Sequence, residues 1–432
     1  MHASFSNPDR KTGEIMEPEV NHHPVTPSSE KERIDSIDML RGFALFGVLL
    51  VNTQMFNDTL HTFSGNPFSY EGTDQTVALL IQIFATGKFY TLFSFLFGLG
   101  FYLFTYRLAE KGIDPLPVFR RRLFYLFVFG LFHMIFFWYG DILTGYTIGG
   151  FVLMLFYRQP ARQVRAWSLA ILTASMILLA WLVSAPTMNP GLMTPQAYEV
   201  YQQSLQRYVT QYREGSYPAT VIFRMQREIP LVFMNFLVWI PKLVGIFLAG
   251  FYAGKIHFFE KSSQYINRLK VARVVSGLLG LLLTGLYLWV GSTRGGALTS
   301  IMSQRQAYFV AELSKELATV MVALFYLSFL MLLWHNPAWQ KKLSVLVPMG
   351  RMAFTHYLAQ SLVLTTIFYG HGLGLMHKIS LAQGVAITLV IYVIQVVLSH
   401  YFLQRFRQGP MEALWRRGTY GGKRLTERGT TP

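Results

Sequence analysis

The sequence contains ten long apolar stretches, and these constrain its fold more than any other feature. They lie at about 39–56, 77–104, 119–138, 141–157, 166–185, 230–253, 272–291, 317–334, 350–369 and 381–402. About 20 apolar residues in a helix cross the hydrocarbon core of a bilayer. Only 14% of the residues are charged, against about 25% in soluble domains. We therefore predict an all-α polytopic membrane helix bundle of about ten transmembrane helices, with the lipid bilayer as its partner.

The basic residues divide unequally between the two sides of this bundle. Of the 38 Lys and Arg, 28 lie in the N-terminal region and at 105–122, 158–165, 254–273, 335–351 and 403–432. Eight lie in the intervening loops, and two lie within the stretches. Because cytoplasmic loops of membrane proteins are enriched in Lys and Arg, both termini are predicted to be cytoplasmic. This topology accounts for most of the net charge of +16, so we expect no nucleic-acid partner.

Three segments follow from these patterns. Residues 1–33 are polar and are predicted to be a disordered cytoplasmic tail. Residues 34–402 form the transmembrane bundle, and residues 403–432 a basic cytoplasmic C-terminal tail. The second apolar stretch is long enough to be tilted or broken near Gly87. The chain has no cysteine, which excludes disulfides, thiolate nucleophiles and thiolate metal sites.

One sizeable segment, 186–229, is predicted on the outer side. Thr194-Pro195 has the pattern of a helix start, Tyr and Leu residues recur every three or four positions, and Gly215 can end the helix. We expect an amphipathic helix lying on the outer face. A lid that binds a partner is the alternative. The chain shows no internal repeat that would indicate an inverted-repeat transporter.

Arginines at the predicted cytoplasmic face are candidates for binding an anion. Arg41 lies one turn beyond Asp38 in the first stretch and can pair with it at i,i+3. Arg120, Arg121 and Arg122 open the third stretch, and guanidinium groups suit phosphate because each offers two parallel donors. These four arginines are predicted to bind the phosphates of a nucleotide or coenzyme. Anchoring of the helices by the positive-inside rule is the alternative explanation.

Three ionisable residues lie inside or beside the apolar stretches and are the candidates for catalysis. His133 lies about 16 Å deeper than Arg122 by helical rise, and Asp141 follows at the next turn. A histidine and a carboxylate on adjoining helices can act as a general base and the group that orients it. Lys88 lies within the second stretch and can face a cavity or extend toward the interface. A packed, hydrogen-bonded histidine is the alternative for His133.

Other polar residues have simpler explanations. Lys242 lies deep in the sixth stretch after Pro241. His356 and Gln360 share one face of the ninth stretch, where hydrogen bonding between helices explains them. His61 lies in the first outer loop. The chain has no zinc-binding spacing, phosphate-binding glycine loop or nucleophile elbow, so we expect no metal.

Several short motifs together resemble the YeiB-like bacterial membrane proteins, a domain-of-unknown-function family. The matching segments are Asp38-x-x-Arg41-Gly42-Phe43-Ala44-Leu45, Gly87-Lys88-Phe89 with Leu92-Phe93-Ser94-x-Leu96-Phe97-Gly98, Gly140-Asp141-Ile142-Leu143, Gly350-Arg351 with Thr355-x-Tyr357 and Gln360-Ser361, and Gly409-Pro410-x-Glu412-x-x-Trp415-Arg416. They extend over about residues 34–421.

This family is grouped with transmembrane acyltransferases that move an acyl group from cytosolic acyl-CoA to an acceptor across the membrane. The resemblance implies acyl-CoA as donor substrate, held by Arg41 and Arg120–Arg122, an unknown small-molecule or glycan acceptor, and a place in the bacterial cytoplasmic (inner) membrane. It leaves open whether His61 or His133 is the functional histidine. Our leading hypothesis is an acyltransferase in which His133 is the base and Asp141 orients it. A transporter and a membrane scaffold without catalysis remain alternatives, and the oligomeric state is open.

Overall fold

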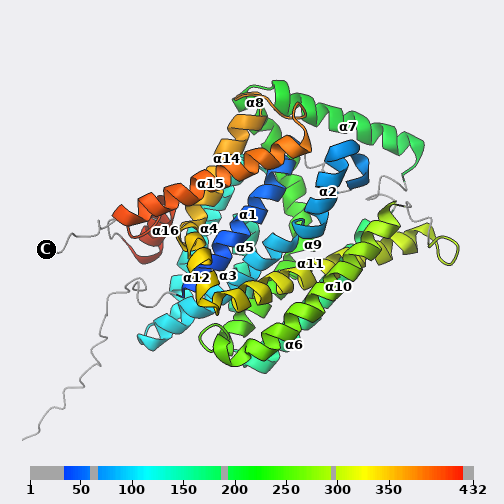
Figure 1. Ribbon diagram of the computed structural model, residues 1–432. Coiled ribbons are helices and arrows are strands. Elements are labelled where there is room, and N and C mark those ends of the chain that lie inside the picture. The colour runs from blue at the N-terminus through cyan, green and yellow to red at the C-terminus, as the bar shows by residue number, and fades with distance from the viewer. Residues whose placement is uncertain (1–33, 59–66, 186–192, 293–297, 422–432) are drawn as a thin grey trace, which may run out of the picture.

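The computed structural model describes residues 34–58, 67–185, 193–292 and 298–421, and all regular elements in these ranges are helices. Figure 1 shows them as a bundle. The helices that build it are α1 (Asp35–Asn57), α2 (Gly72–Phe84), α3 (Lys88–Glu110), α4 (Pro115–Phe136), α5 (Leu143–Met154), α6 (Ala161–Val183), α7 (Pro195–Glu214), α8 (Tyr217–Phe223), α9 (Ile229–Lys255), α10 (Ile266–Ser292), α11 (Gln304–Trp334), α12 (Pro337–Leu343), α13 (Val347–Arg351), α14 (Ala353–Phe368), α15 (Leu381–Arg405) and α16 (Pro410–Tyr420). The predicted tail 1–33 and His61 lie outside the described residues.

Each of the ten apolar stretches contains helix, but the helices differ in length. In the described part of the chain, seven helical segments are long and apolar enough to cross a membrane. The helices outside this group that cover apolar stretches are α4, α5 and α14. The shortest, α5, has 12 residues and is about 18 Å long, well short of the ~30 Å hydrocarbon core. A multi-pass all-helical membrane protein is therefore confirmed, with seven candidate spans.

The second stretch is broken where the sequence predicted it. The helix α2 ends at Phe84 and α3 begins at Lys88, with Gly87 between them at a φ of 80°. Glycine adopts this left-handed conformation at no steric cost. The break at Gly87 therefore separates α2 from α3.

The helices α3 and α9 cross in backbone contact at the centre of the bundle. A Cβ atom on Gly98 would lie 1.9 Å from the carbonyl oxygen of Phe247, and one on Gly250 would lie 1.9 Å from that of Phe95. Both distances are far below van der Waals contact. The pair of glycines therefore sets how closely the two helices approach.

The helix α7 matches the predicted amphipathic helix and lies across one end of the bundle, in contact with α8 (Figure 1). The Thr194 hydroxyl accepts a hydrogen bond from the Ala197 amide at 3.3 Å, and Gly215 is its C-cap. Its buried side is formed by Leu205, Val209 and Tyr212. The rest of the segment differs from the prediction. Residues 217–229 are not a loop but the start of a continuous helical run, Tyr217–Lys255, with a π-helical turn.

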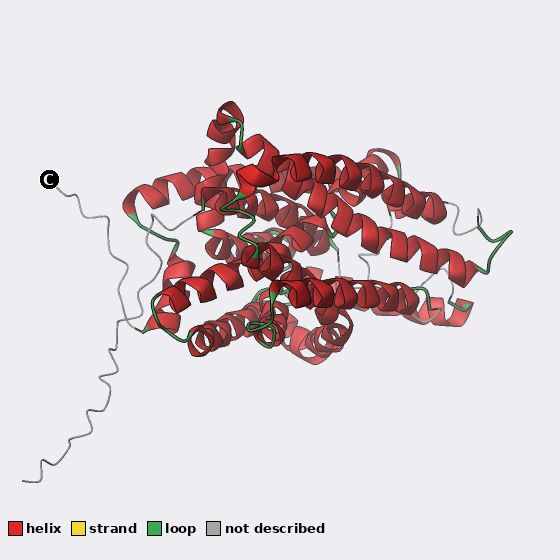
Figure 2. Cartoon of the chain, turned by 90° about the horizontal axis from the view of Figure 1, so that it is seen from below, coloured by secondary structure: helices red, strands yellow, loops and turns green. Residues whose placement is uncertain are grey.

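The opposite end of the bundle contains the start of α1 and the helix α16 (Figure 1). We call it the basic end. Figure 2 shows that helices joined by loops make up the described residues at this end as elsewhere. The segment 403–432 was predicted as a tail, but part of it is structured. The helix α15 continues to Arg405, and α16 folds back against α4 and α14. The reason is its amphipathic pattern, which buries Ala413 and Thr419 against the bundle.

Candidate functional site

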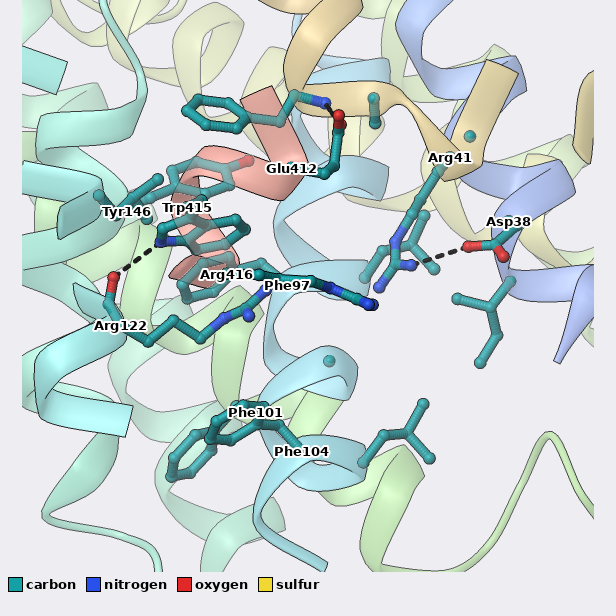
Figure 3. A pocket seen from close by; sticks show the side chains of 18 of the residues that line it. Asp38, Arg41, Phe97, Phe101, Phe104, Arg122, Tyr146, Glu412, Trp415 and Arg416 are labelled. Carbon is teal, nitrogen blue, oxygen red and sulfur yellow. Dashed lines mark hydrogen bonds and ion pairs between the residues drawn. The ribbon is translucent and has the colours of Figure 1, made fainter. Parts of the chain in front are cut away.

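A cavity of about 310 Å³ opens at the basic end, between α1, α3, α4, α14 and α16 (Figure 3). Six cationic side chains line it: Arg41, Arg107, Lys111, Arg122, Arg351 and Arg416. The carboxylates among its lining residues are Asp38 and Glu412. Pockets for cofactors and other small molecules begin at about this size. The excess of cations fits an anionic ligand.

Arg41 forms the predicted pair with Asp38. Its Nη1 lies 2.9 Å from the Asp38 Oδ1, one turn earlier in α1 (Figure 3). The side chain of Arg41 is 31% exposed, so the guanidinium keeps donors free for a ligand. Gly100 of α3 faces it, and a Cβ there would lie 3.4 Å from the Arg41 Nη2.

Arg122 is held by the C-terminal helix. Its guanidinium carbon lies 3.6 Å from the ring centroid of Trp415 and 5.2 Å from that of Phe104. The Trp415 Nε1 donates a hydrogen bond to the Arg122 carbonyl oxygen at 2.9 Å (Figure 3). Arg120 and Arg121 do not line the cavity and are exposed. The structure thus brings two of the four predicted phosphate ligands, Arg41 and Arg122, to one site.

Glu412 anchors α16 to the start of α14. Its carboxylate accepts hydrogen bonds from the backbone amides of Phe354 at 2.8 Å and Thr355 at 3.1 Å, and from the Thr355 hydroxyl at 2.5 Å. An anion at a helix N-terminus is favoured by the helix dipole. Burial raises the pKa of Glu412 above its usual range, although these hydrogen bonds oppose the shift. Glu412 therefore mainly stabilises the contact between α16 and α14 at the cavity wall.

Aromatic side chains form most of the remaining wall. Phe97, Phe101 and Phe104 of α3 lie along one side, and Tyr146 of α5 and Phe354 of α14 face them. Figure 3 shows Phe101 and Phe104 below the guanidinium groups of Arg122 and Arg416. The cavity is thus basic at its mouth and apolar inside. Such a lining suits a ligand with an anionic part and an apolar part.

His133 and Asp141 form the pair that their spacing predicted. The His133 Nδ1 lies 2.9 Å from the Asp141 Oδ1, and neither side chain is exposed. The second carboxylate oxygen of Asp141 accepts the Thr144 amide at 2.7 Å at the start of α5. Among the described residues, the His133 Nε2 has no hydrogen-bond partner. A neutral histidine that donates through Nδ1 keeps an acceptor lone pair on Nε2, which is the geometry of a general base.

This pair lies just behind the inner wall of the cavity and does not line it. Tyr357, a lining residue, has its ring centroid 5.2 Å from that of His133. The Tyr357 hydroxyl accepts a hydrogen bond from the backbone amide of Ile142, the residue after Asp141, at 3.2 Å. The Tyr357 side chain therefore lies between the cavity and His133.

Lys88 lies elsewhere. Its ammonium donates a hydrogen bond at 2.5 Å to the carbonyl oxygen of Gln82, near the end of α2, and it does not line the cavity. Lys242 is ion-paired with Glu316 of α11. The structure thus separates Lys88 from the other two predicted catalytic residues.

His356 and Gln360 connect helices, as interpreted from the sequence. The His356 Nε2 lies 3.2 Å from the Ser399 hydroxyl, and the Gln360 Nε2 donates to the Gln395 Oε1 at 2.8 Å. Both contacts join α14 to α15. The geometry supports a structural role for this part of the ninth stretch.

We did not predict Tyr357 and Glu412 as site residues or Glu316 as a residue of a membrane-spanning helix. The apolar stretch predicted at 317–334 starts one residue after Glu316, whereas α11 begins at Gln304. A capping box between Ser303 and Gln306 marks that start and is visible in the sequence.

Comparison with known proteins shows a family resemblance over nearly the whole chain. The model of the family described as "Protein of unknown function (DUF418)" matches residues 253–422. YxaH of Bacillus subtilis (strain 168) is 32% identical over 412 residues, covering 92% of this chain and 96% of that protein. YeiB of Escherichia coli (strain K12) is 25% identical over 403 residues, covering 90% of this chain and 96% of that protein. Both names carry the word uncharacterized. No solved structure matches the chain.

Proposed function

The chain belongs to the YeiB-like DUF418 family, and we propose that it is a membrane-embedded acyltransferase whose basic cavity binds acyl-CoA. The observation that supports this proposal is the position of the cavity. Arg41 and Arg122 lie at its mouth, and Tyr357 forms part of its inner wall. Tyr357 contacts His133, which is paired with Asp141. The site therefore combines an anion-binding entrance with a buried general base.

In this proposal, the arginines hold the phosphate groups of coenzyme A and the aromatic wall holds the pantetheine and acyl parts. Asp141 accepts the Nδ1 proton of His133 in a hydrogen bond and keeps Nε2 as the base. Nε2 removes the proton of an acceptor hydroxyl or amine while the acceptor atom attacks the thioester carbonyl. The carbon–sulfur bond then breaks, and the proton passes from His133 to the departing thiolate.

The proposal includes the orientation in the membrane. The basic end faces the cytoplasm, both termini lie there, and the ten apolar stretches cross the bacterial inner membrane ten times, with α5 as a short crossing inside the bundle. The uneven distribution of Lys and Arg supports this topology. Because the chain has no cysteine, single cysteines at exposed Glu110 and Gln206 can be labelled in intact cells. Labelling of Glu110→Cys by an impermeant maleimide, without labelling of Gln206→Cys, would contradict it.

The binding step has a matched control within one helix turn. Arg122→Ala is expected to weaken coenzyme A binding by roughly tenfold or more, because a charged hydrogen bond contributes about 1.5–3 kcal/mol. Arg121→Ala removes the same charge from an exposed position and should leave the affinity unchanged. Titration calorimetry with coenzyme A and with acetyl-CoA measures both. Equal losses in the two variants would show that the cavity does not hold the ligand.

A second step tests the chemistry. Purified protein is incubated with radiolabelled acetyl-CoA and a membrane extract, and release of free coenzyme A is measured. His133→Ala should abolish release while acetyl-CoA binding persists. Release that continues undiminished in this variant would exclude His133 as the base.

A transporter is the second candidate, and a specific observation favours it. The ion pair between Lys242 and Glu316 lies inside helices that are candidate membrane spans. Ionisable residues at such depth are common in ion and substrate pathways. Flux of a solute into proteoliposomes without consumption of thioester would favour transport over acyl transfer.

A further inference from the structure

A second group of ionisable side chains lies at the end of α3 away from the cavity mouth. It consists of Lys88 of α3, Lys242 of α9, and Glu312, Lys315 and Glu316 of α11. We call it the lysine–glutamate cluster. All five residues lie within candidate membrane-spanning segments. Placing charges there is costly, and such residues commonly have a function.

The cluster holds more cations than carboxylates. Lys242 is paired with Glu316, and Lys315 is paired with Glu312. Lys88 is the third cation, 1% exposed, within electrostatic range of Glu316, Lys242 and Lys315. Its hydrogen bond goes to the Gln82 carbonyl oxygen. The cluster therefore has two carboxylates and three amines, of which those of Lys88 and Lys242 are buried.

The cluster has an accessible side and a buried side. The Lys315 side chain is 27% exposed and that of Glu312 is 15% exposed, whereas that of Lys242 is 5% exposed. The Lys315 Nζ lies 5.5 Å from the ring centroid of Tyr287 in α10. The Lys242 Nζ lies 5.5 Å from the ring centroid of Tyr90. The exposed fraction of the lysine side chains thus falls from Lys315 in α11 to Lys242 in α9.

Three residues with hydroxyl groups lie between the buried side and the cavity. The Tyr90 hydroxyl is buried, and the Tyr90 ring centroid lies 5.4 Å from that of Trp239 of α9. One turn along α3, the Ser94 hydroxyl lies 2.7 Å from the Tyr146 hydroxyl. Tyr146 lines the cavity. The Ser94 hydroxyl also donates a hydrogen bond to the Tyr90 carbonyl oxygen at 2.7 Å. Hydroxyl-bearing side chains therefore lie between the lysine–glutamate cluster and the basic cavity.

We propose that the lysine–glutamate cluster and the Tyr90–Ser94–Tyr146 hydroxyls form a proton pathway that links the α7 side of the membrane to the basic cavity. A proton from that side first adds to the Glu316 carboxylate, which breaks its ion pair with Lys242. The Lys242 ammonium gives a proton to the hydroxyl groups, and Tyr146 releases one into the cavity. The neutral Lys242 amine then takes the proton of Glu316, and the ion pair reforms.

This cycle of proton transfers needs no oxidant, reductant or second ion. One proton enters, one leaves, and every group returns to its original state. The rearrangement moves only protons between amines, carboxylates and hydroxyls. The pathway does not depend on acyl transfer, because its residues exclude His133 and Asp141. It would serve either an enzyme or a transporter at the cavity.

The experiment measures proton flux with the full chain in liposomes that contain a trapped pH-sensitive dye. A potassium gradient with valinomycin sets the membrane potential, and no acyl-CoA is added. The wild-type protein should carry protons well above the protein-free rate. Glu316→Gln and Tyr146→Phe should each reduce the flux to that rate. Glu260→Gln, in a loop, and Lys255→Met, at the other end of α9, are the controls and should carry the wild-type flux.

Two results would overturn the proposal. One is a wild-type flux equal to that of empty liposomes. The other is an undiminished flux in both Glu316→Gln and Tyr146→Phe, which would make the cluster an ion-pair network for helix packing. Tyr146→Phe removes a single oxygen atom, so it tests the pathway even where Glu316→Gln fails to fold. Monodisperse elution in detergent checks the folding of both variants. Absence of coenzyme A release with intact proton flux would reject the acyltransferase proposal alone.

Discussion

The indole ring of Trp415 lies 3.6 Å from the guanidinium carbon of Arg122 and also donates a hydrogen bond to the Arg122 carbonyl oxygen at 2.9 Å. A residue of the C-terminal helix thus holds both the backbone and the side chain of a residue in α4. These contacts position a cation at the cavity mouth. They also make α16 part of the cavity wall.

Removing the Trp415 side chain should release α16 from α4. Trp415→Ala loses a cation–π contact, a hydrogen bond and apolar packing, whereas Trp415→Phe loses mainly the hydrogen bond, about 1 kcal/mol. Hydrogen exchange of the amides in α16 should be fastest in Trp415→Ala and intermediate in Trp415→Phe. Leu414→Ala changes an exposed neighbour and is the control. Wild-type exchange in Trp415→Ala would mean that other contacts hold the helix.

Several local features could be predicted from sequence because neighbouring residues determine them. The Asp38–Arg41 pair and the break at Gly87 each depend on a few consecutive residues. The His133–Asp141 pair joins residues only eight positions apart across a tight turn. In each case short chain separation limits the geometries available.

Contacts between distant residues could not be predicted in the same way. Glu412 meets Phe354 across 58 positions, and Lys242 meets Glu316 across 74. Their pairing depends on how the helices pack, which hydropathy does not reveal. The same limit explains why Arg121 and Arg122 were grouped together. The orientation of α4 decides which of the two faces the cavity.

Glu412 should make stability depend on pH in an unusual direction. Burial raises its pKa in the folded protein, so the folded state binds the proton more tightly than the unfolded state. Stability is therefore expected to fall as pH rises from the usual carboxyl pKa of about 4.5 toward the raised value. Glu412→Gln should flatten this part of the stability profile, measured as the melting temperature between pH 4.5 and 8.

The control for this measurement is Glu110→Gln, which changes an exposed carboxylate. It should retain the wild-type slope. If Glu412→Gln also retained it, another group would cause the pH dependence. The hydrogen bonds from Phe354 and Thr355 would in that case hold Glu412 in its ordinary ionised form.

Substituting Gly250 should separate α3 and α9. In Gly250→Ala the new Cβ would lie 1.9 Å from the Phe95 carbonyl oxygen, so the backbones must shift. Overpacking of this kind costs about 1–3 kcal/mol, and we expect a lower melting temperature in detergent. Gly285→Ala in α10 is the matched control, because no atom lies within 4 Å of its added Cβ. Equal melting temperatures for the two variants would show that the crossing tolerates a methyl group.

Asp141 should matter more for folding than His133 does. Its carboxylate holds the His133 ring and also accepts the Thr144 amide at the start of α5, so Asp141→Ala loses two buried hydrogen bonds. His133→Ala loses one of them and leaves Asp141 bonded to Thr144. Because each unsatisfied buried group costs about 1–3 kcal/mol, Asp141→Ala should have the lower melting temperature.

The double variant distinguishes a coupled pair from two independent residues. With the shared hydrogen bond, the losses of stability from His133→Ala and Asp141→Ala should add to more than the loss in the double variant. Strict additivity in denaturant titrations would mean that the two side chains do not interact. Asp141→Asn can still accept the Thr144 amide, so it separates the two roles. It should keep most of the stability while losing any chemistry that requires His133 as a base. The amide NH2 of this variant faces Nδ1 and favours the tautomer that carries its proton on Nε2.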